Sequence, residues 1–253
     1  MSKVSIVVPS YNERGNVKKL VEEIDKALEG IDHEILFVDD STDDTPQMIE
    51  EVAKEKPHVR LKHRENEKGL ATAVILGFKL AEGDYLACMD ADLQHPPAIL
   101  RPMFAALEDG ADFCIPSRLI PGGDDGGLNW YRKFVSGTAR LIGQILLPCL
   151  RKISDPTSGL FMFRKEAIAQ ADMRPVGWKI MVEVLATAKY RRIVEIPYAF
   201  AQRESGESKL DSKVTIQYLQ QCFGLMRRAV KNPGVTVERW SSEKMSEMTK
   251  KYT

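Results

Sequence analysis

The chain has 253 residues, 43% of them hydrophobic, which is enough to build one large domain with a proper core. Lysine plus arginine and aspartate plus glutamate both total 36, so the net charge is zero and gives no general attraction to nucleic acid. The four cysteines lie far apart with no CxxC pair, which favours reduced thiols in a cytoplasmic protein over a disulfide framework or a zinc site. The longest weakly polar stretch, residues 141–150, is too short to span a bilayer.

Short β-rich runs alternate with helical patterns in the first half of the chain, which predicts βαβ units and a parallel sheet. The run at residues 4–8 is too short for the apolar region of a signal peptide and is typical of a strand. Further strands are expected at 34–38, 59–62, 84–89 and 112–116. Helices are expected at 16–28 and 69–83, and another helix follows the strand at 34–38 and its DDSTDDTP segment and runs through Ala53.

The second half of the chain is less regular. The pattern predicts a long amphipathic helix at about 128–147, a Gly/Pro segment at 155–163, a helix at 178–190, a strand at 192–200 and a last helix near 212–230. Residues 233–253 are polar and are expected to form a loosely ordered tail.

Ligands of parallel α/β proteins bind at the carboxyl ends of the strands. The segments that follow the predicted strands are PSYNE (9–13), DDSTDD (39–44), DADLQHPP (90–97) and SR (117–118). Three of these four segments carry carboxylates, so this edge of the sheet is expected to hold a cation or to supply a base.

Asp90 and Asp92 follow the strand at 84–89 and would point the same way if the extended geometry persisted. Two carboxylates on one face can chelate Mg²⁺ or Mn²⁺, a cation that usually also contacts substrate phosphates, and Gln94 adds a neutral oxygen. The structural alternative is that Asp92 caps a helix that starts near Pro96, with Asp90 as a turn residue.

Seven segments resemble family-2 inverting glycosyltransferases with the GT-A fold, in order and spacing. They are SIVVPSYNE, FVDDSTDD, KGLATAVILGF, MDADLQHPP, DPTSG, GWKIMVE and RESGESKL. The resemblance covers roughly residues 3 to 225 and is greatest to the dolichol-phosphate (polyprenol-phosphate) mannose synthases, to which DADLQHPP, YRKFVS (131–136) and RESGESK are specific.

This resemblance implies transfer of mannose from GDP-mannose to a polyprenyl (dolichyl) phosphate, with inversion to a β-mannosyl phosphate. It implies an α/β GT-A fold, in which a Rossmann-like, mostly parallel sheet is flanked by helices and acceptor-side helices follow. One catalytic domain is expected at 1–232, with a nucleotide-binding half to about 117 and an acceptor-side half from about 118.

The resemblance assigns site residues by their positions in the matching segments. The metal residues would be Asp90, Asp92 and Gln94, and the catalytic residues Asp92 and Arg203. The donor nucleotide-sugar would contact Pro9, Tyr11, Glu13, Val38, Asp40, Asp90, Ala91, Asp92, Gln94, Lys179, Arg203 and Ser208.

Several of these residues also have purely structural interpretations. Asp43 is expected to form an Asx turn or a helix cap, whereas Asp40 is expected to face the ligand. Residues 203–209 are interpreted as a flexible lid over the diphosphate, although such a loop can also be an ordinary solvated surface. Lys179 and Glu183, at i and i+4, could form an ion pair, with Glu183 orienting Lys179 towards the donor.

The acceptor phosphate is assigned by the resemblance to Arg118, Arg132 and Ser136. Arg132, Ser136 and Arg140 are four residues apart and share one helical face, but Arg140 lies outside the match and could simply be solvated. The flanking apolar residues, from Leu141 to Leu147, suit either the core or the surface of a bilayer.

No general base is expected, because the second pKa of a phosphate monoester is about 6 and the acceptor is already mostly dianionic at neutral pH. Asp155 or Glu183 would be the candidates if a base were required. The competing functions are a UDP-glucose-dependent polyprenyl-phosphate glucosyltransferase, a soluble polysaccharide glycosyltransferase and an inactive nucleotide-binding regulatory subunit.

Many relatives continue into hydrophobic membrane segments, whereas this sequence ends in VERWSSEKMSEMTKKYT. We therefore expect either a peripheral protein at the membrane surface, with a membrane-anchoring partner subunit as one option, or a piece of a longer chain.

Overall fold

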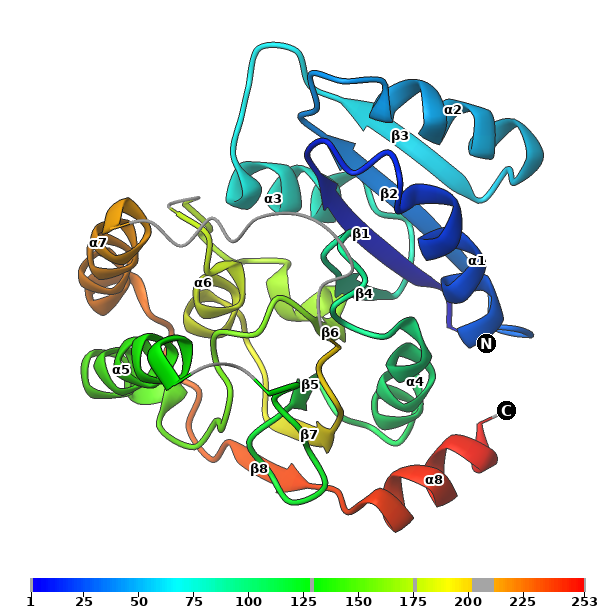
Figure 1. Cartoon of the computed structure of the whole chain (residues 1–253). Coiled ribbons are helices and arrows are strands. Elements are labelled where there is room, and N and C mark those ends of the chain that lie inside the picture. The colour runs from blue at the N-terminus through cyan, green and yellow to red at the C-terminus, as the bar shows by residue number, and fades with distance from the viewer. Residues whose placement is uncertain (1, 128–129, 175–176, 202–211, 253) are drawn as a thin grey trace.

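A mostly parallel sheet organises the chain in the computed structural model, which describes residues 2–127, 130–174, 177–201 and 212–252 (Figure 1). The side chains of residues 130–134 and 212–215 lie outside this description. Within the described ranges the sheet has eight strands in the order β3-β2-β1-β4-β6-β5-β7-β8. Only β6 runs antiparallel to its neighbours, β4 and β5.

The N-terminal half follows the expected βαβ alternation. The strands are β1 (Val4–Ser10), β2 (His33–Asp39), β3 (Val59–His63), β4 (Tyr85–Cys88) and β5 (Phe113–Ser117), and the helices are α1 (Val17–Ala27), α2 (Thr45–Glu55), α3 (Leu70–Leu80) and α4 (Leu100–Glu108). The α4 helix carries Pro102 in its first turn, where a missing N–H removes no helical hydrogen bond.

The second half contains the expected helices and two strands that the sequence analysis missed. Its elements are α5 (Trp130–Leu146), β6 (Phe161–Arg164), α6 (Ile180–Thr187), β7 (Arg192–Pro197), α7 (Ser212–Arg228), β8 (Thr236–Arg239) and α8 (Ser242–Lys251). The β6 strand lies in the interior of the sheet and its first three residues are all buried, so it shows no polar alternation that would mark it as a strand.

The expectation of a loosely ordered C-terminal tail is wrong. The β8 strand pairs in parallel with β7 and extends the sheet, and α8 packs against α4. Trp240, between them, is 1% exposed and belongs to the core, with Met245, Met248 and Tyr252 packed against the same cluster. A few large apolar side chains therefore anchor a segment whose composition is otherwise polar.

Helices cover both faces of the sheet, giving three layers (Figure 1). Successive residues of β1 and β2 alternate between two cores, with Ile6 and Phe37 in one and Val7 and Leu36 in the other. The first core includes apolar residues of α1, α2 and α4, and the second includes residues of α3, α6 and α7. Both faces are closed, so the carboxyl edge of the strands is left to carry polar side chains.

Candidate active site

The ends of β1 and β2 bring together the first group of predicted donor residues. Pro9 and Val38 are buried and face each other in the pairing of these two strands. Tyr11 follows as an exposed side chain, with Lys68 Nζ 5.8 Å from its ring centroid. Glu13 accepts a hydrogen bond from the Asn16 side chain in the turn before α1. Tyr11 is thus a partly exposed aromatic side chain at the carboxyl edge of the sheet.

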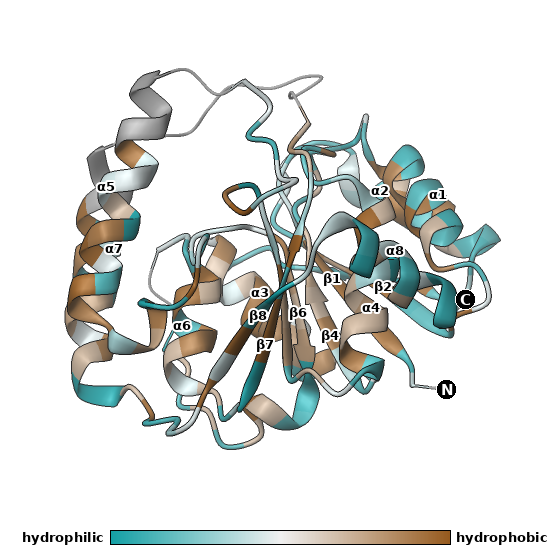
Figure 2. Ribbon diagram, turned by 90° about the horizontal axis from the view of Figure 1, so that it is seen from below, coloured by the Kyte–Doolittle hydropathy of each residue, from teal (hydrophilic) through white to brown (hydrophobic). Residues whose placement is uncertain are grey.

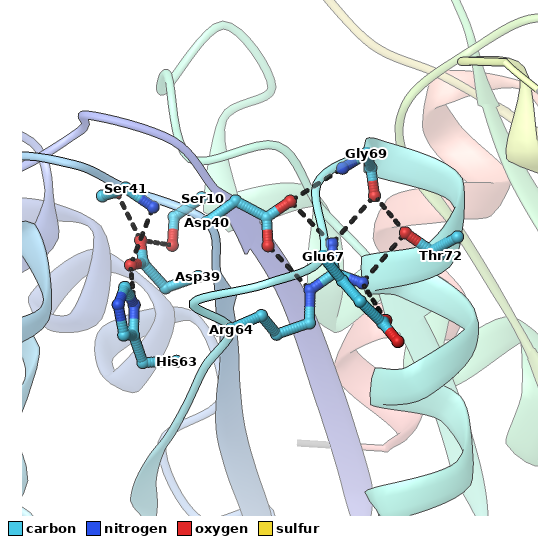
Figure 3. Close-up of polar contacts among 9 residues, drawn as sticks. All are labelled: Ser10, Asp39, Asp40, Ser41, His63, Arg64, Glu67, Gly69 and Thr72. Atoms are coloured by element: carbon cyan, nitrogen blue, oxygen red, sulfur yellow. Dashed lines mark hydrogen bonds and ion pairs between the residues drawn. The ribbon is translucent and has the colours of Figure 1, made fainter.

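Asp40 is held by protein groups rather than left open to solvent (Figure 3). Arg64 donates from Nε to Oδ1 at 2.7 Å and from Nη2 to Oδ2 at 2.6 Å, and the Gly69 amide donates to Oδ2 at 2.9 Å. The Arg64 and Asp40 side chains are only 4% and 8% exposed. A donor contact by Asp40 stays a prediction, and the structure assigns the residue a second role: it fixes the loop before α3.

Asp39 forms a second polar cluster that the sequence analysis did not identify (Figure 3). Its Oδ1 accepts from the hydroxyls of Ser10 and Ser41, and its Oδ2 lies 2.8 Å from Nδ1 of His63. Asp43 behaves as expected, because its Oδ1 accepts from the backbone amide of Thr45, the first residue of α2. The contacts of Asp39 join the carboxyl ends of β1, β2 and β3.

The prediction that Asp90 and Asp92 point the same way assumed an extended chain. The segment after β4 does not keep this extended geometry. The β4 strand ends at Cys88, and Leu93 adopts a positive φ of 59°. Asp92 Oδ1 accepts from the Gln94 amide at 3.1 Å, which is an Asx turn. Asp90, Asp92 and Gln94 are all half-buried, and Ala91 is buried. A turn rather than an extended strand therefore positions these residues after β4.

His95 is a further candidate for the site that the sequence analysis did not assign. It is buried, stacks on Tyr198 with a centroid separation of 5.6 Å, and places Nδ1 3.1 Å from the Tyr198 hydroxyl. Burial lowers the pKa of His95 to about 4, although Asp92 acts to raise it, so the ring is neutral at neutral pH. The HPP sequence, which begins three residues after Asp92, was the available signal for this residue.

The loop at 154–159, which precedes β6, touches three of the predicted site residues. Asp155 Oδ2 accepts from Nε and Nη2 of Arg118 at 2.9 and 2.7 Å. The Thr157 carbonyl accepts from Lys179 Nζ at 3.2 Å. Gly159 lies against the carboxylate of Asp90. This loop therefore connects the metal, donor and acceptor residues that the sequence analysis assigned separately.

Lys179 belongs to this same group of charges. Burial lowers the pKa of Lys179, while the charges of Asp155 and Asp90 act to raise it. The expected partnership with Glu183 is wrong, because Glu183 is completely buried and pairs instead with Arg228 Nη1 at 2.9 Å, joining α6 to α7. Lys179 precedes α6 rather than lying within it, so the two residues are not separated by one helical turn.

Three of the expected contacts lie wholly or partly outside the described residues. Arg203 and Ser208, with the predicted lid at 203–209, fall in the range 202–211. Arg132 and Ser136 are both on α5, as expected, but the Arg132 side chain is not among those described. Arg140 is anchored rather than simply solvated, since its Nη1 donates to the Ser154 carbonyl at 3.3 Å.

Gly159 provides a test of how closely this site is packed. A Cβ added there would approach Asp90 Oδ2 to 2.2 Å, and this oxygen is the movable end of a side chain. We expect Gly159→Ala to displace the carboxylate with little loss of thermal stability. Misplacement of a reacting group by about 1 Å can cost roughly 10²-fold in rate, so turnover should fall sharply.

The matched control is Gly224→Ala on α7, where a Cβ would meet no atom within 4 Å. Initial rates and melting temperatures of the two variants are compared side by side. Wild-type turnover by Gly159→Ala would mean that the position of the Asp90 carboxylate does not matter to the reaction.

The three-layer architecture, with its acidic turn after β4 and polar loops at the strand ends, is a GT-A fold. The chain belongs to glycosyltransferase family 2, whose domain (glycosyl transferase family 2) matches residues 5–171. The resemblance stated from the sequence is therefore confirmed at the level of family and fold.

The proteins that are similar to this chain include two dolichol-phosphate mannosyltransferases and a solved glycosyltransferase-fold structure. A dolichol-phosphate mannosyltransferase of Pyrococcus furiosus is 44% identical over 226 residues, covering 89% of this chain and 64% of the relative's length. A dolichol-phosphate mannosyltransferase of Saccharomyces cerevisiae is 39% identical over 230 residues, covering 86% and 84% respectively. The structure of glucosyl-3-phosphoglycerate synthase from Mycobacterium tuberculosis with Mn²⁺ and UDP superposes with a TM-score of 0.66 at 18% identity, covering 92% of this chain and 82% of that one.

Proposed function

We propose that this protein transfers mannose from GDP-mannose to a dolichyl or polyprenyl phosphate, with inversion to a β-mannosyl phospholipid. The observation that carries the proposal is the 39–44% identity to two proteins named dolichol-phosphate mannosyltransferase. The chain spans 64% of the length of the Pyrococcus furiosus relative and 84% of the yeast relative. The activity, the donor and the acceptor are therefore all parts of the proposal.

Asp90, Asp92 and Gln94 would hold Mg²⁺ or Mn²⁺, and the cation, when bound, would neutralise the diphosphate that leaves with the nucleotide. Their oxygen ligands suit such a hard cation. Such an ion commonly shares its coordination with substrate phosphates, and Mn²⁺ accompanies UDP in the M. tuberculosis structure of this fold.

Arg118 is the described residue that suits the acceptor phosphate. Asp155 holds its Nε and Nη2 on one side, and Phe200 lies under the guanidinium at 4.9 Å from the ring centroid. These contacts would fix the direction in which the remaining N–H groups point. The buried Asp155 is committed to this pairing and Glu183 to Arg228, which supports a mechanism without a dedicated base.

The helices α5 and α7 present an apolar surface that suits a lipid substrate (Figure 2). They pack side by side, and each carries large apolar side chains that are more than half exposed, namely Leu141, Ile145, Ile216, Phe223 and Met226. No described helix is long and apolar enough to cross a bilayer. Contact of this apolar surface with the interface of a membrane would bring the acceptor phosphate to the carboxyl edge of the sheet. A membrane-anchoring partner subunit stays a prediction.

The test combines purified protein, GDP-mannose, Mn²⁺ and vesicles that contain a polyprenyl phosphate, with mass spectrometry of the lipid product. We expect a mannosyl phospholipid, no product in chelator, and protein that sediments with the vesicles. A parallel reaction with UDP-glucose identifies a glucosyltransferase if its product is the faster to form. Tight GDP binding without turnover in either reaction would indicate a regulatory subunit instead.

The acceptor assignment predicts a selective defect in Arg132→Ala. A charge-assisted contact contributes roughly 1.5–3 kcal/mol, so kcat/KM for the lipid should fall at least about tenfold while GDP-mannose affinity stays close to that of the wild type. Arg132→Lys should recover only part of the loss, since a point charge cannot pair with two phosphate oxygens at once. Donor affinity is measured by calorimetry and lipid use by initial rates.

A loss of GDP-mannose affinity in Arg132→Ala would place the residue in the donor site instead. No change in either quantity would leave it as a solvated residue on the face of α5.

A further inference from the structure

Three potential metal ligands converge at the opposite edge of the sheet from Asp90. Asp25 lies on α1, His33 is the first residue of β2, and His58 precedes β3, so the two histidines lie where the parallel strands begin. His33 Nε2 and His58 Nε2 are 3.1 and 2.8 Å from Oδ1 of Asp25. All three ligand atoms lie within 4.8 Å of one another, and no other described group of three or more such residues meets this condition.

The hydrogen bonding of His33 indicates what the cluster can bind. Its Nδ1 lies 2.8 Å from the Ile31 carbonyl, which can only accept, so Nδ1 carries the proton. Nε2 is therefore the nitrogen that faces the Asp25 carboxylate, at 3.1 Å from Oδ1, and is the one placed to bind a cation. A ring whose other nitrogen donates to a carbonyl is also the usual arrangement of a metal-bound histidine.

We propose that Asp25, His33 and His58 form a Zn²⁺ site, distinct from the acidic turn after β4. Two imidazole nitrogens and one carboxylate oxygen are ligands that zinc accepts, and a water would complete the tetrahedron. The Asp25 carboxylate suits a one-oxygen contact, because Lys56 Nζ already donates to the other oxygen, Oδ2, at 2.5 Å. The side chains of the three ligands and of Lys56 are between 13% and 32% exposed, so the ion can enter from solvent.

The three ligands come from α1 and from the starts of β2 and β3. Bound zinc would join α1 to the starts of β2 and β3, far from the reacting groups. It would therefore act on the stability of the nucleotide-binding half rather than on the transfer step.

The proposal is tested with the untagged 253-residue chain, stripped of metal and titrated with Zn²⁺ in the Asp92→Asn background. That substitution weakens binding at the acidic turn after β4. We expect one tightly bound equivalent and a rise in melting temperature on zinc addition. His33→Gln and His58→Gln, each in this background, should weaken binding at least about tenfold, since even the loss of a supporting residue typically costs that much. The control is His63→Gln, which removes a half-exposed histidine that contacts Asp39 instead.

Substitution with Co²⁺ provides a second readout, because four-coordinate cobalt absorbs strongly in the visible range. We expect these bands in the Asp92→Asn protein and in its His63→Gln variant, and their loss in the His33→Gln and His58→Gln variants. Circular dichroism of the metal-free proteins verifies that each variant is folded. Equal zinc affinity in the His33 and His58 variants, or no tight equivalent in the Asp92→Asn protein, would overturn the proposal and leave a hydrogen-bonded ion cluster.

Discussion

Replacement of Asp92 by Asn is expected to reduce turnover by about 10²–10³, the typical cost of removing one group that stabilises charge in a transition state. Asp92 is half-buried in the turn after β4, and its negative charge acts to raise the pKa of the buried His95, which burial lowers. Asn keeps the size of the side chain and an oxygen that can accept from the Gln94 amide, so the turn should persist. Initial rates with GDP-mannose, Mn²⁺ and polyprenyl phosphate measure the effect.

The matched control for this variant is Asp172→Asn, which removes an exposed carboxylate that pairs with Arg174 before α6. Both proteins should melt close to the wild-type temperature, and only Asp92→Asn should lose activity. Raising the Mn²⁺ concentration should restore part of the rate if the defect is in metal affinity. An Asp92→Asn protein that remains as active as the wild type in the presence of chelator would contradict the metal proposal.

The elements of the N-terminal half could be predicted because each carries its own local signal. The α1 helix shows an apolar stripe from Val17 to Ile24, and β1 and β2 are short apolar runs that end at polar residues. Parallel pairing then brings the ends of these strands to one edge, where Pro9 and Val38, both assigned to the donor by the resemblance, pair across β1 and β2. The family resemblance supplied the rest of the expected site.

Contacts between distant segments could not be read from the sequence. The side chains of Asp40 and Arg64 are 24 residues apart, and those of Arg118 and Asp155 are 37 apart. No periodicity in the sequence connects such pairs. The same limit explains the tail, where the pairing of β8 with β7 and the packing of Trp240 and α8 against the core distinguish an ordered segment from a polar extension. It also explains Glu183, for which the sequence suggested an ion pair with Lys179, four residues earlier. In the structure Glu183 pairs with Arg228 instead.

Arg64→Met is expected to destabilise the protein more than any other substitution considered for the donor side. It would leave the buried carboxylate of Asp40 without its bidentate partner, and breaking a buried ion pair in this way typically costs about 3–5 kcal/mol. For a chain of this size the melting temperature should fall by roughly 6–20 °C. The control is Arg14→Met, which breaks an exposed pair with Asp44 and should cost no more than about 1 kcal/mol.

The double variant Asp40→Asn with Arg64→Met separates the structural role of Asp40 from its predicted contact with the donor. Removing both charges leaves no unpaired ion, so the double variant should be more stable than Arg64→Met alone. Comparison of the double variant with both single variants and the wild type measures the coupling of the pair. Calorimetric titration with GDP then reports on the ligand. A folded double variant that binds GDP as tightly as the wild type would mean that Asp40 acts only through the loop before α3. If it is folded but binds GDP at least about tenfold more weakly, Asp40 would contact the nucleotide directly, since hydrogen bonds to a charged group contribute roughly 1.5–3 kcal/mol.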